Sequence, residues 1–470
     1  MERRKGRRLV VFPLPLQGHI SPMLQLAGIL HSKGFSITII HTNFNSPNPS
    51  HYPNFTFHSI PDGLSESEIE ASASDIVLLL KLLNAKCVEP FSDCLVKLLS
   101  DASEDPISCL ISDAIFYFTR AVADTLKLPR IVLRTGGVSS FLAFAAFPLL
   151  RERGYLPIQD SQLEKPVEEL PPLKVKDLPV INTDDPNAFY EVVAGLVNET
   201  KASSGVIWNS YEDLEHSALV TLRQEFPIPI FPIGPFHKYS SPSSSSSLLT
   251  QDQSSISWLD KQAPKSVIYA SFGSIAGLNE AEFLEIAWGL ANSKQPFLWV
   301  VRPGLVLRGS EWLEPLPSGF LETLNGRGHI IKWAPQQDVL AHPAVGAFWT
   351  HNGWNSTLES ICEEVPMICM PCFSDQKVNS KYVSDVWKVG LQLESGVKRE
   401  EIERTIRRLM VEKEGEDIRD RISELKEKAN LCLQQGGTSR KSLDSLVTHI
   451  SKLESFTFKS HSQPSRTRPV

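Results

Sequence analysis

The stretch AVGAFWTHNGWNSTLESICEEVPMICMP, residues 344–371, places a polar segment between two apolar ones. Short apolar runs on both sides of a helical segment predict a strand–helix–strand unit. At the helix start, Asn355 or Ser356 is suited to accept from free backbone N–H groups, with Glu359 closing a capping box. The alternative is that these N–H groups bind an anionic ligand. The segment alone leaves both interpretations open.

The same alternation of strand and helix extends in both directions along the chain. It begins with LVVFPLPL (9–16), PMLQLAGILHSKG (22–34) and FSITIIHTN (35–43), and CLISDAIF and RIVLRT continue it around helical SDAIFYFTRAVADTLKL. A serine-rich segment, KYSSPSSSSSLLTQDQSS (238–255), interrupts the pattern, which restarts at SVIYASFGS (266–274). Repeated βαβ units predict an α/β fold with two doubly wound parallel sheets whose carboxyl ends face a central cleft.

These shifts in composition predict the domain boundaries. The expected segments are a Rossmann-like N-terminal domain at 1–237, a Ser-rich linker at 238–256, a Rossmann-like C-terminal domain at 257–440, a C-terminal helix at 441–458 that packs back on the N-terminal domain, and a disordered tail at 459–470.

The bulk composition excludes several classes of protein. A chain of 470 residues with 41% hydrophobic and 21% charged residues is typical of a soluble protein with more than one domain. A net charge of −7 gives no reason to expect nucleic acid or an acidic membrane as a partner. Seven scattered cysteines favour reduced thiols and a cytoplasmic location. The apolar run after MERRKGRR is short and contains Pro13 and Pro15, unlike a signal peptide, and no stretch is long enough to span a bilayer.

Two residues at predicted strand ends are suited to acid–base chemistry. His19 follows the first strand and Asp113 follows the strand in CLISDAIF, so both should face the cleft. An aspartate that bonds one imidazole nitrogen leaves the other basic, so a His–Asp dyad would deprotonate a hydroxyl. The alternatives are a histidine with a purely structural role and an aspartate that only caps the following helix.

Several other catalytic patterns are missing from the sequence. There is no G-x-S-x-G elbow, no phosphate-binding G-x-x-x-x-G-K-[ST] loop and no G-x-G-x-x-G after the first strand. No two aspartates lie two positions apart, as they would in a D-x-D metal site. Cys369 and Cys372 have C-x-x-C spacing, but no second pair completes a zinc set, so a redox or zinc role is the weaker interpretation.

Residues 333–376, WAPQQDVLAHPAVGAFWTHNGWNSTLESICEEVPMICMPCFSDQ, closely resemble the donor signature of plant secondary-product glycosyltransferases. FPLPLQGHISPMLQLA, SDAIFYF, GVIWNSYEDLE, WLDKQAPKSVIYASFGS and WVVRP extend the resemblance over essentially the full chain. The N-terminal stretches are most similar to the subgroup that contains the steviol-glycoside branching and cytokinin N-glucosyltransferases. The resemblance implies the GT-B fold and transfer of sugar from a UDP-sugar, without a metal or other cofactor.

The resemblance also implies roles for individual residues. His19 would be the catalytic base and Asp113 its partner. Along the donor the implied contacts are Trp333 and Ala334 at uracil, Gln336 and Glu359 at the ribose, Ser274, His351, Asn355 and Ser356 at the diphosphate, and Thr135, Trp354, Asp375 and Gln376 at the sugar, with Gly18 beside them. Gln376 favours UDP-glucose in this family. A positively charged histidine, hydroxyls and helix-start N–H groups would then stabilise the leaving UDP.

The acceptor is less determined by the sequence. Apolar residues near the dyad suggest a pocket for a terpenoid or flavonoid, or a glycoside of one: Leu16, Phe116, Tyr117, Phe141 and Phe144. For any one of these, a place in the ordinary core is the alternative. We expect a monomer that binds a UDP-sugar and a small-molecule acceptor. The remaining alternatives are another UDP-sugar, a hormone acceptor, or a UDP-sugar-binding protein without catalysis.

Four positions depart from the family pattern. Asn352 stands where cysteine is common and should have no effect. Glu364 replaces a usual glycine and should place acid near the sugar. Gly136 and Gly137 should leave unusual room beside it.

Overall fold

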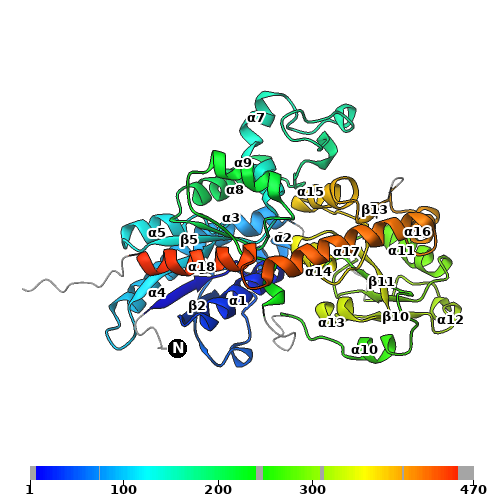
Figure 1. The fold of residues 1–470 in the computed structure, drawn as a ribbon, viewed down its shortest axis with the longest axis horizontal. Coiled ribbons are helices and arrows are strands. Elements are labelled where there is room, and N and C mark those ends of the chain that lie inside the picture. Colours follow the sequence, from blue (N-terminus) through cyan, green and yellow to red (C-terminus); the bar gives the residue numbers. More distant parts are fainter. Residues whose placement is uncertain (1–6, 74, 240–246, 307–311, 394–395, 454–470) are drawn as a thin grey trace, which may run out of the picture.

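The computed structural model describes residues 7–73, 75–239, 247–306, 312–393 and 396–453, and it contains two parallel β-sheets in separate lobes (Figure 1). The first lobe holds a seven-stranded sheet in the order β3-β2-β1-β4-β5-β6-β7. Its strands are β1 (Arg8–Phe12), β2 (Ser36–Thr42), β3 (Phe55–Ile60), β4 (Ile107–Asp113), β5 (Arg130–Arg134), β6 (Val206–Trp208) and β7 (Ile230–Pro232).

The second lobe holds a six-stranded sheet in the order β10-β9-β8-β11-β12-β13. Its strands are β8 (Val267–Ser271), β9 (Phe297–Val300), β10 (Gly328–Ile331), β11 (Val345–Thr350), β12 (Met367–Cys369) and β13 (Gly390–Gln392). All pairings in both sheets are parallel, and the strand order reverses between β1 and β4 and again between β8 and β11. The prediction of two doubly wound sheets is therefore confirmed.

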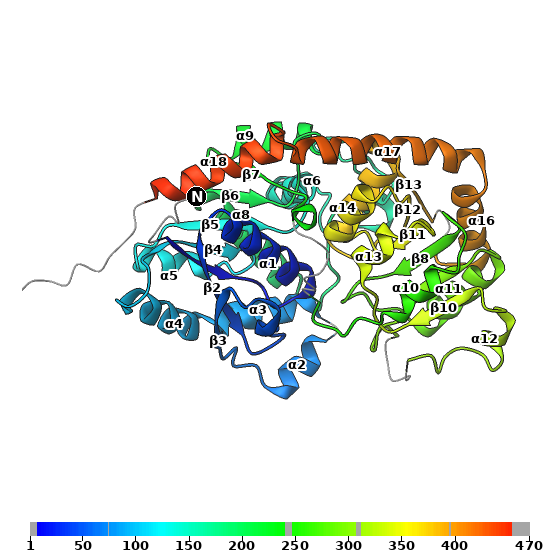
Figure 2. The same cartoon turned by 60° about the horizontal axis from the view of Figure 1, so that its bottom comes forward.

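Helices cover both faces of each sheet (Figures 1 and 2). In the first lobe they are α1 (Gln17–Ser32), α2 (Glu66–Ser72), α3 (Ile76–Lys86), α4 (Val88–Ser100), α5 (Thr119–Thr125), α6 (Val138–Ala145), α7 (Phe147–Glu152), α8 (Pro186–Lys201) and α9 (His216–Glu225). In the second they are α10 (Ser254–Leu259), α11 (Glu280–Asn292), α12 (Phe320–Thr323), α13 (Gln336–Ala341), α14 (Trp354–Cys362), α15 (Asp375–Lys381) and α16 (Arg399–Met410), and α17 (Lys413–Leu433) and α18 (Thr438–Lys452) follow.

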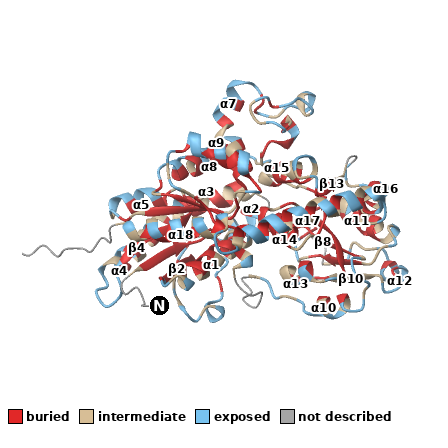
Figure 3. Cartoon of the chain, in the orientation of Figure 1, coloured by how far each residue is buried: buried red, intermediate tan, exposed pale blue. Residues whose placement is uncertain are grey.

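The central strands are wholly buried, as Figure 3 shows. Every residue of β1, β4, β8 and β11 is buried. Strands covered by helices on both faces read as continuous apolar runs, which is why the sequence pattern located them.

Two helix boundaries differ from the prediction. Helix α1 begins at Gln17 rather than near Pro22, where the helical segment PMLQLAGILHSKG begins, so His19 lies in its first turn. Helix α5 spans only Thr119–Thr125, although the pattern predicted a helix from residue 112. The Asp113 Oδ1 atom accepts a hydrogen bond of 2.9 Å from the Ile115 backbone, and such a side-chain bond favours a turn over a helix.

The chain ends by crossing back between the lobes (Figure 2). Helix α17 packs on α14 of the second lobe, and α18 contacts β7 and β4 of the first. Side chains of α18, among them Leu443 and Leu446, belong to the same buried cluster as Leu9 of β1. The predicted tail at 459–470 and part of the predicted linker, 240–246, lie outside the described residues.

Candidate active site

A cleft of about 350 Å³ lies between the two lobes. Loops that follow β1 and β5 line it from the first lobe, and loops that follow β8, β11 and β12 line it from the second. It therefore lies at the carboxyl ends of both sheets and beside both reversals of strand order, where ligands of α/β proteins bind. His19 and every residue predicted for the donor line this cleft.

His19 and Asp113 form a close pair at the cleft wall. The His19 Nδ1 atom lies 2.7 Å from Asp113 Oδ2, and the Asp113 side chain is only 2% exposed. The Thr135 hydroxyl oxygen lies 3.0 Å from the same nitrogen. The second Asp113 oxygen accepts from the Ile115 backbone and does not cap α5, so the capping alternative does not hold. A carboxylate that accepts from Nδ1–H leaves Nε2 as the basic atom.

The start of α14 carries no side-chain cap. Gly353 is the N-cap residue, and neither Asn355 nor Ser356 accepts from the first-turn N–H groups, because both already lie within the helix. Instead, Asn355 Nδ2 donates to the Gly18 carbonyl of the first lobe over 2.9 Å. The capping interpretation of the opening stretch is therefore wrong. The helix presents first-turn N–H groups to the cleft, which is the arrangement that binds phosphate in other proteins.

Glu359 and its neighbours form a polar wall beside α14. Gln336 Nε2 donates to Glu359 Oε2 over 2.7 Å and to the Ser356 hydroxyl over 2.9 Å. Gln337 donates to the other Glu359 oxygen over 2.8 Å, a contact that the sequence did not indicate. Burial raises the pKa of Glu359, while the two amides act in the opposite direction. A carboxylate held in this way is suited to accept hydrogen bonds from the hydroxyl groups of a ribose.

His351 is packed between two glycines that permit its position. A Cβ added at Gly273 or Gly353 would lie 2.6 or 2.5 Å from the imidazole ring. Burial, together with the nearby charge of Arg302, lowers the pKa of His351 to about 4. The ring is therefore neutral at pH 7, so the expectation of a positively charged histidine is corrected. Arg302, which sequence reasoning missed although it lies in WVVRP, donates to the Gly273 and Ala276 carbonyls and so holds the loop that carries Ser274.

The predicted sugar end is built by α15 and by Trp354. The Gln376 Oε1 atom accepts from the backbone of Cys372 over 2.9 Å and of Phe373 over 3.2 Å, which directs its amide group away from that loop. Asp375 accepts from Asn379 over 3.3 Å, and burial raises its pKa. The Trp354 indole N–H donates to the Asn209 carbonyl of the first lobe over 2.7 Å.

Gly137 leaves no spare room, contrary to the expectation, whereas a Cβ at Gly136 would make only an ordinary contact. A Cβ added at Gly137 would lie 2.9 Å from the Trp354 ring, and one at Gly136 would lie 3.4 Å from Asp375 Oδ2. Glycine is therefore needed at position 137, because the Trp354 ring packs directly against the backbone of the first lobe at this point.

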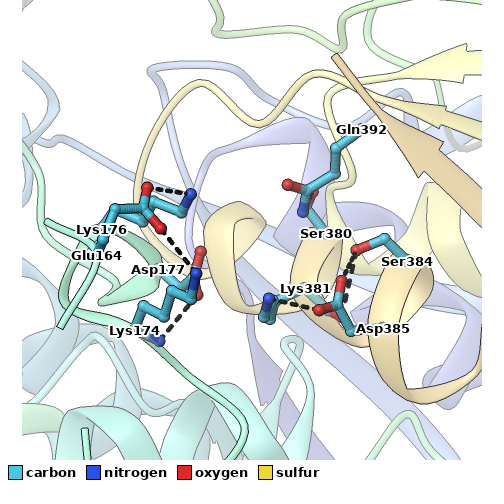
Figure 4. Close-up of polar contacts among 9 residues, drawn as sticks. All are labelled: Glu164, Lys174, Lys176, Asp177, Ser380, Lys381, Ser384, Asp385 and Gln392. Atoms are coloured by element: carbon cyan, nitrogen blue, oxygen red, sulfur yellow. Dashed lines mark hydrogen bonds and ion pairs between the residues drawn. The ribbon is translucent and has the colours of Figure 1, made fainter. Parts of the chain in front are cut away.

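Residues 153–185, which we call the strap, pack against α15 and hold the sugar end in place. The Val180 carbonyl accepts from the Ser374 backbone over 3.4 Å, and Leu173 of the strap packs with Val378 of α15. Figure 4 shows the charged groups of this contact: Glu164 pairs with Lys174 and Lys176 on the strap, opposite the Lys381–Asp385 pair.

The acceptor side of the cleft differs from the prediction. Leu16 and Phe144 line it, whereas Phe116 and Phe141 are fully buried in the core and the Tyr117 ring packs toward Gly195. The prediction is corrected for Phe116 and Phe141, whose rings pack in the core of the first lobe, and the half-buried Tyr117 does not line the cleft either. The apolar lining comes mainly from α3, α8 and adjacent loops, and of these residues only Ile115 lies in a quoted motif, SDAIFYF: Ile76, Leu80, Ile115, Ile181, Phe189, Val192, Val193 and Leu196.

The remaining departures from the family pattern have structural explanations. Asn352 is buried with a φ of 59°, a left-handed conformation that asparagine tolerates better than most residues. Glu364 pairs with Lys426 over 3.3 Å and does not line the cleft, so the expected acid near the sugar is corrected. Cys369 and Cys372 are free thiols whose pKa values burial raises to about 12, which does not favour redox chemistry.

Two features are absent from the described part of the chain. Within it, no three His, Cys, Asp or Glu side chains are grouped so as to hold a metal ion. Among the helices of those same residues, none combines the length and the apolar character needed to cross a membrane.

Known proteins resemble this chain over nearly its full length. The family model described as UDP-glucoronosyl and UDP-glucosyl transferase matches residues 23–427. UDP-glycosyltransferase 76B1 of Arabidopsis thaliana is 56% identical over 96% of this chain and 99% of its own length, and UDP-glycosyltransferase 76G1 of Stevia rebaudiana is 49% identical over 96% and 98%. The solved structure of Phytolacca americana UGT2 with UDP-2fluoro-glucose and pterostilbene is 28% identical, with a TM-score of 0.80, over 95% of this chain and 100% of that one. The chain therefore belongs to the plant UDP-glycosyltransferase family, and it is a glycosyltransferase of the GT-B fold.

Proposed function

We propose that this enzyme transfers glucose from UDP-glucose to a hydroxyl of an apolar small molecule, with His19 as the base. The observation that carries the proposal is the 2.7 Å contact between His19 Nδ1 and Asp113 Oδ2, with His19 lining a cleft that has both apolar and polar walls. Asp113 orients the imidazole and stabilises its protonated form. His19 Nε2 then takes the proton of the acceptor hydroxyl, and the oxygen attacks the anomeric carbon from the face opposite the phosphate, with inversion.

The donor is proposed to lie along the second lobe. Trp333 and Ala334 would hold the uracil, Gln336 and Glu359 the ribose, and Ser274, His351 and the start of α14 the diphosphate. These groups provide N–H and hydroxyl donors to the leaving UDP, and the mechanism needs no metal ion in addition. Thr135, Trp354, Asp375 and Gln376 would surround the sugar. The Nε2 group of Gln376, which has no partner among the described residues, supports glucose as that sugar, as does the glucose analogue in the Phytolacca americana complex.

The acceptor is proposed to be a terpenoid or flavonoid, or a glycoside of one. The acceptor side is lined mainly by aliphatic side chains of α3 and α8, together with Phe144 and Phe189. Such walls bind apolar frames without demanding a planar ring, which favours a terpenoid of the two. We further propose that the protein acts as a cytoplasmic monomer, with the domain boundaries stated above.

The test compares wild-type protein with His19→Ala. Each protein is incubated with UDP-glucose and a panel of terpenoids, flavonoids and their glycosides, and the products are detected by their mass. Loss of the base should lower kcat by about 10²–10⁴-fold while UDP binding is retained. Products carrying one added hexose from wild-type protein alone would support the proposal. Equal turnover by both proteins would exclude His19 as the base, and UDP binding without any turnover would identify a binding protein.

A further inference from the structure

One charged side chain of the cleft has no partner. Arg134, at the end of β5, is 7% exposed and lines the cleft. Among the residues that the structure describes, it has no hydrogen-bond or ion-pair partner, and its Nε atom is buried with its bonding capacity unused. Burying a charged group without a partner is costly, so such a group calls for an explanation.

The other two buried arginines of the described chain are both paired. Arg130, on the same strand, lies 3.0 Å from a carboxylate oxygen of Glu199 and also donates to the Glu199 carbonyl. Arg8 donates to the Leu98 carbonyl over 2.8 Å and lies 3.6 Å from Glu104. Each of these two arginines therefore has at least one protein partner, although Arg8 Nε and Arg130 Nη1 are also unbonded. Among the buried arginines of the described residues, Arg134, which lines the cleft, is the one whose side chain has none.

The surroundings of Arg134 hold it in place but do not satisfy it. Its guanidinium carbon lies 5.0 Å from the centre of the Phe141 ring, a cation–π contact that leaves the N–H edges of the group unused. Asp113 and Asp375 favour the charged guanidinium electrostatically, but neither forms a hydrogen bond with it. Asp113 is hydrogen-bonded to His19 and to the Ile115 backbone, and Asp375 is hydrogen-bonded to Asn379. The remaining direction for a partner is the cleft itself.

The adjacent residue relates Arg134 to the reacting groups. Thr135 follows it in the chain and lies 3.0 Å from the catalytic imidazole. A guanidinium presents a planar set of donors that matches the two oxygens of a carboxylate. We propose that Arg134 binds a carboxylate in this cleft, so that one substrate of the enzyme carries a carboxylate close to the reacting group.

This inference rests on the proposed function, because it concerns the substrates of the same cleft. The carboxylate has two possible sources, the acceptor and the sugar of the donor. An acceptor carboxylate would make the substrate a hydroxy acid with an apolar frame. A donor carboxylate would make the sugar a uronic acid. Both place the same chemical group on Arg134, and the experiment separates them.

The experiment uses the full chain as wild type, Arg134→Met, Arg134→Lys and the control Arg120→Met, which removes an exposed arginine of α5. The acceptor arm compares mandelate and 2-hydroxybenzoate, in which the carboxylate lies beside the hydroxyl, with their methyl esters, using UDP-glucose as donor. The donor arm compares UDP-glucuronate with UDP-glucose on methyl 4-hydroxybenzoate. A binding arm titrates benzoate and benzamide into the UDP-bound protein by calorimetry, which requires no turnover.

Each arm gives a ratio of kcat/KM values, acid to ester in the acceptor arm and UDP-glucuronate to UDP-glucose in the donor arm. We expect Arg134→Met to lower one of these two ratios by about 10–100-fold, because the variant loses a charge-assisted hydrogen-bonded pair. Arg134→Lys should retain part of the ratio, and Arg120→Met should leave it within about threefold of wild type. A fall in the first ratio identifies the acceptor as the source, and a fall in the second identifies the donor. Because the readout is a ratio, a general loss of activity cancels.

Unchanged ratios in both arms, with hexose transfer intact, would overturn the role of Arg134 and leave the proposed function standing. If wild-type protein transfers no sugar at all, the proposed function fails, and the binding arm decides on Arg134 separately. Tighter binding of benzoate than of benzamide, lost in Arg134→Met, would support the carboxylate site. Equal binding of the two by wild type would contradict it.

Discussion

Single side chains of this cleft are held by specific partners before any substrate arrives. Asp113 has one oxygen on His19 and the other on the Ile115 backbone, so neither the carboxylate nor the imidazole is free to turn. Both oxygens of Glu359 are likewise taken by amides of Gln336 and Gln337. Such preorganisation reduces the rearrangement that the reaction would otherwise require.

Asp113→Asn tests the pair at the level of one atom. An amide in this position preserves the size of the side chain but no longer accepts from His19 Nδ1–H with a full negative charge. The imidazole then favours the tautomer that protonates Nε2, so kcat should fall by about 10²–10⁴-fold. UDP affinity, measured by calorimetry, should change little. A variant with wild-type kcat would show that Asp113 does not assist His19.

The buried His351 predicts how stability depends on pH. Its pKa of about 4 in the folded protein lies below the ordinary value of 6.5, so the unfolded chain binds the proton more readily. The contribution of His351 to the free energy of unfolding is therefore complete above pH 6.5 and is lost as the pH falls towards 4. His237, whose pKa burial lowers to about 3, acts in the same direction.

Denaturant unfolding of wild-type protein and His351→Gln at several pH values measures this dependence. Wild-type stability should fall between pH 6.5 and 4, and the variant should show a shallower slope because one titrating group has been removed. Identical slopes for the two proteins would contradict a neutral, buried His351.

Strand ends position most of the site, and this explains how far the sequence could predict it. Buried parallel strands read as apolar runs, so the positions of His19, Asp113, Thr135 and His351 at the carboxyl ends followed from the pattern. Resemblance supplied the further roles along α14 and α15. The acceptor wall of α3 and α8 could not be predicted, because a residue such as Val192 on a helix face reads the same whether it lines a cleft or a core.

Close contact between elements explains the glycine at position 137. In Gly137→Ala the new methyl group would lie 2.9 Å from the Trp354 ring and 3.2 Å from Glu215 Oε1. Trp354 would have to move away from the first lobe, which should lower stability by about 1–3 kcal/mol and reduce kcat/KM as well. Gly28→Ala on α1 is the control, since no atom lies within 4 Å of its added Cβ. It should be neutral or stabilising by roughly 0.5–1 kcal/mol. Thermal unfolding and steady-state kinetics measure both, and equal behaviour of the two variants would show that the Trp354 contact is not tight.

Over the whole molecule, the two lobes are joined at several points besides the linker. Across the cleft, the Asn355 side chain donates a hydrogen bond to the Gly18 carbonyl, and the Trp354 indole donates one to the Asn209 carbonyl. The strap also packs on α15. Helices α17 and α18 join the lobes on a separate face (Figure 2). Because Asn355 and Trp354, which make two of these contacts, are proposed for the donor side, occupancy of the donor site and the relative position of the lobes should depend on each other.

Helix α18 should stabilise strands β1 and β2 of the first lobe. Leu446 of α18 is fully buried in the cluster that contains Leu9 of β1 and Ile37 of β2, although more than 400 residues separate them in the sequence. Leu446→Ala should lower the free energy of unfolding by about 2–5 kcal/mol, because the cavity lies in the core of the first lobe. Leu431→Ala on α17, where the side chain is 60% exposed, is the control and should change stability by less than about 0.5 kcal/mol. Hydrogen exchange locates the effect: in Leu446→Ala the amides of β1, β2 and β4 should exchange faster than those of β8 and β11. Faster exchange confined to the second sheet would contradict the packing of α18 on the first lobe. The expected pattern would mean that β1, which leads into His19, depends for its stability on α18, more than 400 residues later in the sequence.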